Sequence, residues 1–224
     1  MGYSIRTFTG RATSWIAWSA VIALSLLIVV NASAYASVER NHAFLIEKGD
    51  VVRDTTWRAC FYAHVFGGAI CLLTGPLLVS GTLLRRRPAA HRILGRAYVL
   101  SVLGCSGPAA IELSLYARGG VLGQLGFLVL GVAWILTTAI GVERIAHRRV
   151  AEHRVWMLRS YALTLSAVFF RSLQAVFYVA GVGDDVNYLV SLWSSLVVSL
   201  VVGEVLARAP SRSIAGFQLA GVES

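Results

Sequence analysis

The sequence predicts an all-α integral membrane bundle of six transmembrane helices, and two observations lead to this prediction. Hydrophobic residues make up 57% of the 224 residues and charged residues 14%, with a mean hydropathy of +0.70, as is typical of multi-pass membrane proteins. In addition, six apolar runs are each long enough to span, since about 20 residues cross the hydrocarbon core. The runs lie at 14–36, 59–84, 94–117, 121–143, 156–181 and 187–207.

The six runs account for most of the chain, so we expect one membrane domain over residues 1–224. The only sizeable connection runs from Ser37 to Trp57, and the sequence shows no phosphate-binding loop or low-complexity segment. A net charge of +9 would suggest nucleic-acid binding in a soluble chain. Here the arginines flank apolar runs, so membrane orientation explains them, and membrane lipids rather than nucleic acid are the expected partners.

The connections between the runs alternate in charge, which predicts the orientation of the chain. Arginines gather in the connections at 85–96 and 144–159, whereas the connection after the fifth run carries Asp184 and Asp185. By the positive-inside rule, both arginine-rich connections and both termini are cytoplasmic, in the cell (inner) membrane. The segment 34–36 reads Ala-Tyr-Ala, as in a signal-peptide cleavage site, but the run before it is long for a signal peptide, which favours a retained anchor.

The fifth run contains ionisable and amide side chains deep within its apolar stretch. A guanidinium at Arg171 must face protein or a water-filled cavity, because lipid cannot solvate it. At about 100° per residue, Arg171 and Gln174 share one helical stripe with other polar residues. The stripe consists of His153, Ser160, Thr164, Arg171, Gln174 and Tyr178.

Two polar residues in neighbouring runs are expected near the outer ends of their runs, and Arg171 lies deeper but has a side chain long enough to reach outward toward them. His64 lies near the outer end of the second run, and Glu112 ends a stripe in the third run with Tyr98, Ser101 and Cys105. One interpretation is a buried Glu112–Arg171 ion pair that fixes helix register, with His64 as a hydrogen-bonding neighbour. Another is a polar cavity, open to the outside, that binds a ligand or relays protons through His64, Glu112, Arg171 and Gln174. A third is that these groups do not meet.

Two similar basic segments precede the third and fifth runs, HRILGRAY and HRVWMLRSY. Their likeness indicates a parallel repeat of two helical hairpins, formed by runs two and three and by runs four and five. Their basic and aromatic residues are explained by anchoring at the membrane interface. The alternative is a cytoplasmic pocket whose histidines bind haem b, a quinone or an anionic lipid head group. The residues of this collar are His91, Arg92, Arg96, His153, Arg154 and Arg159.

Three segments, HVFGGAICLLTGPLL, AHRILGRAYVLSVL and HRVWMLRSYALTLSAVFFR, resemble a bacterial family of predicted membrane proteins with a domain of unknown function. The resemblance covers residues 60–175 and implies a multi-pass membrane protein without an assigned chemistry. It places His64 and Arg171 at motif positions, which favours the polar cluster. The motif positions are His64, Gly67, Gly68, Gly75, Pro76, His91, Arg92, Gly95, Arg96, Tyr98, Trp134, His153, Trp156, Met157, Arg159, Ser160, Tyr161 and Arg171.

Three classes of function therefore remain open. The first is binding or transport of a small ligand through the intramembrane polar cluster, and the second is a membrane redox protein that holds haem b or a quinone. The third is a structural or assembly protein without a ligand. No nucleophile–base pair, carboxylate pair or metal-ligand spacing stands out, and the three cysteines form no CxxC motif, so an enzyme or a metal site is not favoured.

Overall fold

The computed structural model describes residues 3–33, 35, 45–46 and 48–208, with side chains from residue 16 onward except Ala17. The described residues form helices joined by short connections and contain no strand, which confirms the all-α class. Five helical spans are long and apolar enough to cross a membrane, and α1 adds a shorter apolar stretch at Trp18–Ser33. The segments of the predicted cleavage site, 34–36, and of the tail, 209–224, lie mostly or wholly outside the described residues.

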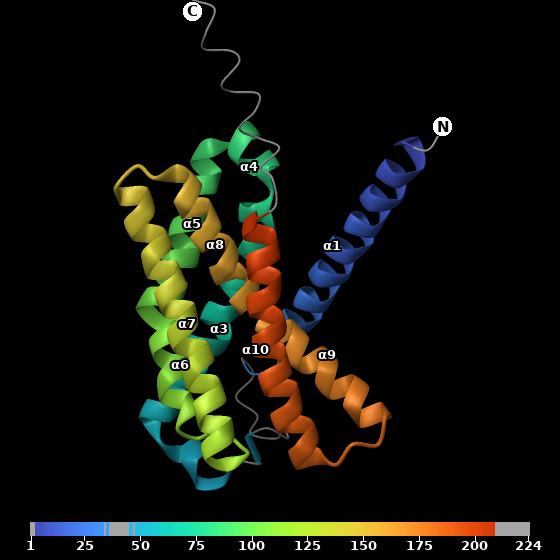
Figure 1. Cartoon of the computed structure of the whole chain (residues 1–224). Helices are drawn as coiled ribbons and strands as arrows, with labels where there is room; N and C mark the ends of the chain where they lie inside the picture. Colours follow the sequence, from blue (N-terminus) through green and yellow to red (C-terminus); the bar gives the residue numbers. More distant parts are fainter. Residues whose placement is uncertain (1–2, 34, 36–44, 47, 209–224) are drawn as a thin grey trace, which may run out of the picture.

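The spans follow one another along the chain with short turns between them (Figure 1). Three of the five spans are single helices, α3, α7 and α10. The other two correspond to the third and the fifth of the six predicted runs; we call them the third and the fifth span, and each is divided into segments. The long elements are α1 (Tyr3–Ser33), α3 (Thr55–Val79), α5 (Pro88–Leu100), a π-helical turn η3 (Ser101–Ser106), α6 (Gly107–Ser114), α7 (Gly120–Ala146), α8 (Val150–Thr164), α9 (Ser166–Val179) and α10 (Asp184–Arg208), and the short ones are η2 (Gly49–Arg53) and α4 (Gly81–Arg86).

The two ends of the bundle differ in charge. Helix α4 and the α7–α8 turn lie together at the upper end in Figure 1, and both belong to arginine-rich connections, so we name this the basic end. Segment η2, the α6–α7 turn and the α9–α10 turn lie at the other end, which we name the lower end. The predicted hairpins form, since α3 packs against α5 and α6, and α7 packs against α8. That the two hairpins are repeats of one another stays a prediction.

The third and fifth spans are interrupted, and neither break was predicted. In the third span, Pro108 lacks the N–H that would continue the helical ladder, and the turn immediately before it, Ser101–Ser106, is π-helical. In the fifth span, α8 ends at Thr164 and α9 begins at Ser166, with Leu165 between them. Figure 1 shows α9 leaving the line of α8 and diverging from the bundle, toward the lower end of α1. Helices α1 and α9 are in contact there.

The centre of the bundle is held by a cluster of buried hydroxyl and indole groups from α5, α7 and α8. The Tyr98 hydroxyl lies 2.9 Å from Ser160 Oγ and 2.8 Å from Thr164 Oγ1. The Trp134 indole donates to Thr164 Oγ1 at 3.0 Å, and Thr138 Oγ1 lies 2.7 Å from Ser160 Oγ. All five side chains are buried, and every polar atom has a partner, so we call this set the hydroxyl network. In a membrane such bonds tie helices together.

Candidate functional site

A cavity of about 520 Å³ lies next to the hydroxyl network, on the side of the lower end. Helices α1, α3, α6, α7, α9 and α10 all contribute to its wall, and Trp134 and Thr164 belong to both the network and the cavity. Its volume is in the range of small-molecule sites, which are mostly apolar with few polar groups. Helix α9 packs against α10, and its residues Ser166, Ala167, Phe170, Arg171 and Gln174 form one side of the cavity wall.

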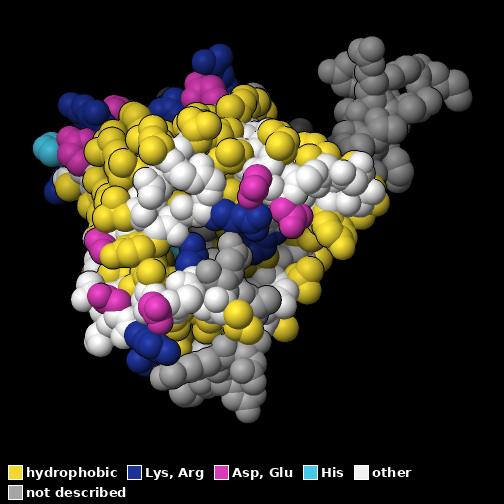
Figure 2. Space-filling model, turned by 90° about the horizontal axis from the view of Figure 1, so that it is seen from below, with side chains coloured by type: hydrophobic (Ala, Val, Ile, Leu, Met, Phe, Trp, Pro, Cys, Tyr) yellow, Lys and Arg dark blue, Asp and Glu magenta, His cyan; other side chains and the backbone are white. Residues whose placement is uncertain are grey.

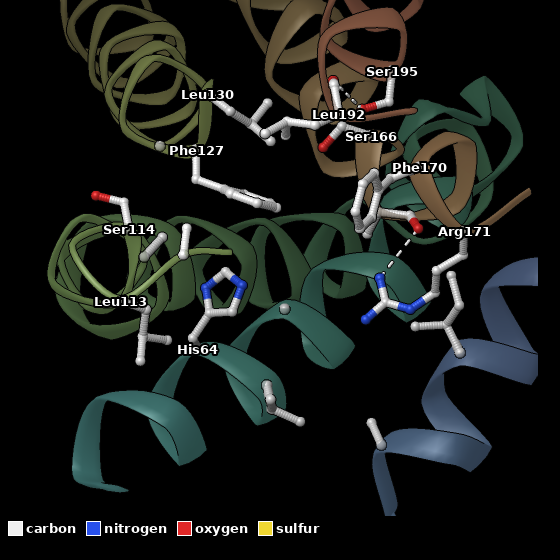
Figure 3. A pocket seen from close by; sticks show the side chains of 18 of the residues that line it. His64, Leu113, Ser114, Phe127, Leu130, Ser166, Phe170, Arg171, Leu192 and Ser195 are labelled. Carbon is white, nitrogen blue, oxygen red and sulfur yellow. Dashed lines mark hydrogen bonds between the residues drawn. The ribbon is translucent and has the colours of Figure 1, made fainter. Parts of the chain in front are cut away.

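Three residues of the predicted polar cluster line this cavity: His64 from α3, and Arg171 and Gln174 from α9. Figure 3 shows the His64 ring and the Arg171 guanidinium extending into the same space from different helices. His64 lies about 14 Å along α3 from Thr55, and Arg171 about 12 Å along α9 from Val179, at about 1.5 Å per residue. The two side chains are close enough to interact electrostatically.

The orientation of His64 is fixed by the third span. Its Nδ1 lies 3.1 Å from the carbonyl oxygen of Ser106, which can only accept, so Nδ1 carries a hydrogen. Ser106 Oγ in turn donates to the His64 carbonyl at 2.9 Å. Ser106 belongs to the π-helical turn, and such turns occur often at functional sites. With Nδ1 bound, Nε2 is the ring nitrogen left for a ligand.

Arg171 is the least satisfied charged group of the cavity. Its Nη1 donates to the carbonyl oxygen of Ala167 in its own helix at 3.2 Å. Within the described part of the chain, no carboxylate lies within ion-pair distance of the guanidinium. Arg171 is exposed and belongs to a span long and apolar enough to cross a membrane, where a guanidinium without a carboxylate partner is costly and suggests a functional site.

The lower end of the cavity carries two more basic side chains, Lys48 and Arg118. Arg118 forms an ion pair with Asp185 at the start of α10, with 2.9 Å between Nη2 and Oδ1. The Lys48 Nζ donates to the carbonyl oxygen of Tyr116 at 2.5 Å, which joins the first connection to the α6–α7 turn. Figure 2 looks onto this end and shows basic side chains gathered near its centre, with acidic side chains beside them.

Aromatic rings form much of the remaining wall. Phe127, Phe170 and Tyr188, from three different helices, contact one another with ring centroids 5.4 to 6.2 Å apart. Trp57 stacks on Phe61 at 5.2 Å and is 2% exposed, and its indole nitrogen has no hydrogen-bond partner. The sequence analysis did not identify these residues, nor Lys48 and Arg118. The identity of an aromatic residue, or of a basic residue in a loop, does not show how deep it lies in the membrane or which way its side chain faces.

The predicted Glu112–Arg171 ion pair is wrong. Glu112 does not line the cavity, and its electrostatic neighbour is Cys60 at the start of α3. The stripe predicted for the third span assumed about 100° per residue from Tyr98 to Glu112. The π-helical turn at Ser101–Ser106 breaks this phase, so the residues that follow it are rotated away from the expected face. Accordingly Tyr98 is 1% exposed, whereas Cys105 lies on the surface.

The stripe predicted for the fifth span is divided by the break at Leu165. Thr164, Arg171 and Gln174 line the cavity as expected. Ser160, in contrast, is buried in the hydroxyl network, and Tyr178 is 72% exposed near the end of α9. The part of the stripe that lines the cavity is therefore shorter than the predicted stripe. It begins at Thr164, which also belongs to the hydroxyl network.

Several motif positions build the packing of the bundle and not the cavity. A Cβ on Gly75 would overlap the ring of Tyr161, which is 1% exposed, and a Cβ on Gly67 would lie 2.8 Å from the Cβ of Ser106. Tyr98 and Ser160 act in the same way within the hydroxyl network, whereas Trp134 belongs both to the network and to the cavity wall. Only His64 and Arg171 among the motif residues lining the cavity carry an ionisable group.

The collar residues lie at the basic end, far from the cavity. His153 Nδ1 lies 2.7 Å from the Gly141 carbonyl, and the guanidinium of Arg159 binds Glu204 of α10 at 2.9 Å. Arg159 also lies over the Trp156 ring, 4.6 Å from its centroid. Arg92, Arg96 and Arg154 have no side-chain partner among the described residues, and the first two are exposed. These contacts fit interfacial anchoring.

The histidines fall into two separate groups, which limits how haem could be held. His64 lies roughly 22 Å along α3 from the basic end, where His91 and His153 occupy the first turns of α5 and α8. His64 therefore cannot share one iron with either of them. His91 and His153 interact electrostatically, and the Nδ1 of His91 is buried without a partner. Among the described residues no group of three or more His, Cys, Asp or Glu could hold a metal ion.

Residues 61–207 match a family described as "Predicted membrane protein (DUF2306)". This range covers α3 to α10 and therefore includes the hydroxyl network and most of the cavity wall, whereas α1 lies outside it. No curated protein and no solved structure matches the chain.

Proposed function

The chain belongs to the DUF2306 family of predicted membrane proteins, and we propose that it is a membrane-embedded binding module for a small ligand. The ligand occupies the cavity next to the hydroxyl network, where His64, Arg171 and Gln174 supply polar contacts. Transport through the bundle would require the same binding step first. The remaining wall, aromatic and aliphatic, encloses the apolar part of the ligand.

One observation carries this proposal: a guanidinium lines the cavity, and among the described residues no carboxylate lies within ion-pair distance of it. Arg171 donates a hydrogen bond to the carbonyl oxygen of Ala167 in its own helix. In a membrane, a charged group without a partner carries a high free-energy cost. A chain that retains such a group is therefore expected to use it in binding. A bound ligand that accepts hydrogen bonds would supply the missing partners.

We further propose that the cavity faces the outside of the cell membrane and that both termini are cytoplasmic. The arginine-rich connections lie at the basic end, opposite the cavity. The positive-inside rule favours a cytoplasmic basic end, which directs the lower end outward.

The test is to ask whether filling the cavity removes a bound small molecule. The protein and two variants are purified in neutral lipid nanodiscs, and small molecules extracted from each are quantified by mass spectrometry. Ala167→Phe fills the cavity, whereas Val132→Phe adds the same ring at an exposed α7 position that does not line it. We expect a molecule that is retained by Val132→Phe and depleted about tenfold or more by Ala167→Phe. Identical extracts from all three proteins would contradict the proposal.

A redox function is the second candidate, because His91 and His153 interact at the basic end and His91 has an unpartnered buried nitrogen. Histidine pairs are common haem ligands. The measurement is an absorbance spectrum of the purified protein, oxidised and then reduced with dithionite. A Soret band that sharpens on reduction and is lost in His91→Ala or His153→Ala would support this function. A colourless protein reconstituted with haem b that still shows no band would exclude it.

A further inference from the structure

The charges around the cavity indicate the class of ligand. Three basic side chains line it, and no Asp or Glu does so among the described residues. The basic residues are Lys48, Arg118 and Arg171. Arg171 is exposed and Lys48 and Arg118 are partly exposed, so ions from solution screen these charges in part. Arg171 has no carboxylate partner among the described residues, and a negative charge on the ligand would complement it.

The three basic groups differ in what they already bind. Arg118 is paired with Asp185, and Lys48 donates to the Tyr116 carbonyl. Arg171 uses a hydrogen of Nη1 on Ala167 and has no carboxylate partner, although a guanidinium carries several N–H groups. Arg171 is therefore the group with binding capacity to spare.

Arginine is suited to one kind of anion. Its planar fork matches the two oxygens of a carboxylate or the oxygens of a phosphate, and bidentate bonds of this kind are strong and directional. A hydrogen bond to a neutral carbonyl or hydroxyl would not compensate the charge. An oxyanion at Arg171 would compensate it without any change in the helices.

The wall beside Arg171 is apolar and selects the other part of the ligand. Phe127 and Phe170 meet edge to face, with their centroids 5.8 Å apart. Figure 3 shows these rings, Leu130 and Leu192 around the space into which Arg171 and His64 extend. Burial of a hydrocarbon body against such side chains is favourable in proportion to its apolar area.

We propose that the ligand is an amphipathic anion, with a carboxylate or phosphate head on Arg171 and an apolar body against the aromatic wall. This inference rests on the proposed function and adds to it the charge and the polarity of the ligand. Arg171 is a binding residue in this account, and Lys48 and Arg118 strengthen the positive potential at the lower end of the cavity.

The test uses water-soluble probes that differ only in the head group: octanoate, octyl phosphate and octanol, with inorganic phosphate as a head without a body. Binding to the nanodisc protein is followed by tryptophan fluorescence, because Trp57 and Trp134 line the cavity. At least one of the two anions should bind about tenfold or more tightly than octanol, since a charge-assisted bond replaces a neutral one. The stronger of the two identifies the head group.

Substitution separates a charge effect from damage to the cavity. Arg171→Gln should weaken the binding of the preferred anion about tenfold and leave octanol unchanged. Arg208→Gln, at the exposed end of α10 outside the cavity, is the matched control and should change neither.

Octanol binding as tightly as both anions, or weakened as much as they are by Arg171→Gln, would overturn the inference, as would inorganic phosphate binding as tightly as octyl phosphate. If no octyl probe binds while Ala167→Phe still depletes a co-purified molecule, the ligand class is wrong and the proposed function stands.

Discussion

The hydroxyl network and the cavity lie side by side in the same bundle and treat polar groups in opposite ways. In the network, Tyr98, Ser160 and Thr164 are buried, and their hydroxyls bind one another at 2.8 to 2.9 Å. In the cavity, Arg171 donates to a carbonyl of its own helix and has no carboxylate partner among the described residues. Trp134 and Thr164 belong to both regions and form the boundary between them.

This difference distinguishes polar side chains that stabilise a membrane protein from polar side chains that bind a ligand. Both regions contain side chains that lipid cannot solvate. Where every donor meets an acceptor inside the protein, the group stabilises the fold, and its loss should reduce stability. Where donors are left over at a cavity, the group costs stability, and its loss should affect binding instead.

Gly75→Ala should destabilise the packed region most. A Cβ at this position would overlap the Tyr161 ring, which is 1% exposed and has no room to move. We expect a loss of about 3 kcal/mol in the free energy of unfolding, the upper range for overpacked cores. The measurement is reversible unfolding of the purified protein in mixed micelles. Gly104→Ala is the control, because a Cβ there meets no atom within 4 Å. Equal stability of both variants would contradict the packing of α3 on α8.

Tyr98→Phe should cost about 1 kcal/mol in the same unfolding assay, because it removes the hydroxyl that bridges Ser160 and Thr164. The loss is modest because both partners retain other hydrogen bonds. Tyr178→Phe is the matched control, since this side chain is 72% exposed. We expect Tyr98→Phe to leave ligand binding in the cavity within about twofold of wild type, because its hydroxyl does not face the ligand. A tenfold loss of binding without loss of stability would place the network inside the functional site.

Arg171→Gln should change the free energy of unfolding by less than about 0.5 kcal/mol, because the guanidinium has no ion-pair partner to lose. Arg159→Gln, which removes the bond to Glu204, should cost about 1 kcal/mol. A buried structural ion pair at Arg171 would instead cost about 3–5 kcal/mol on removal of one partner. Such a loss would support a structural role for Arg171. The polar groups of the cavity would then stabilise the fold, as those of the hydroxyl network do.

The sequence predicted the fold well because long apolar runs and arginine-rich turns are local signals. It also placed His64 and Arg171 in the same half of the bundle, since depth follows from counting residues along a helix. It failed on Glu112 because rotation about the helix axis depends on every turn before it, and Pro108 follows a π-helical turn that no periodicity revealed. The break at Leu165 could not be predicted, because no proline or glycine lies near it in the fifth run.

Thiol accessibility from outside the cell shows whether the cavity is open to the outside while the hydroxyl network beside it is closed. Cys71 is 0% exposed and contacts the network through the Tyr98 carbonyl, so it reports on the closed region. In a background with Cys60→Ser and Cys105→Ser, Ala110→Cys places a second thiol on the cavity wall. The reagent is a membrane-impermeant, negatively charged methanethiosulfonate, applied to intact cells.

We expect Ala110→Cys to be labelled from outside, Arg171→Gln to slow this labelling, and Cys71 to stay unlabelled. Equal protection of both thiols would contradict an open cavity beside a closed network. Labelling of Ala110→Cys only from the cytoplasmic side of inverted vesicles would contradict the proposed orientation.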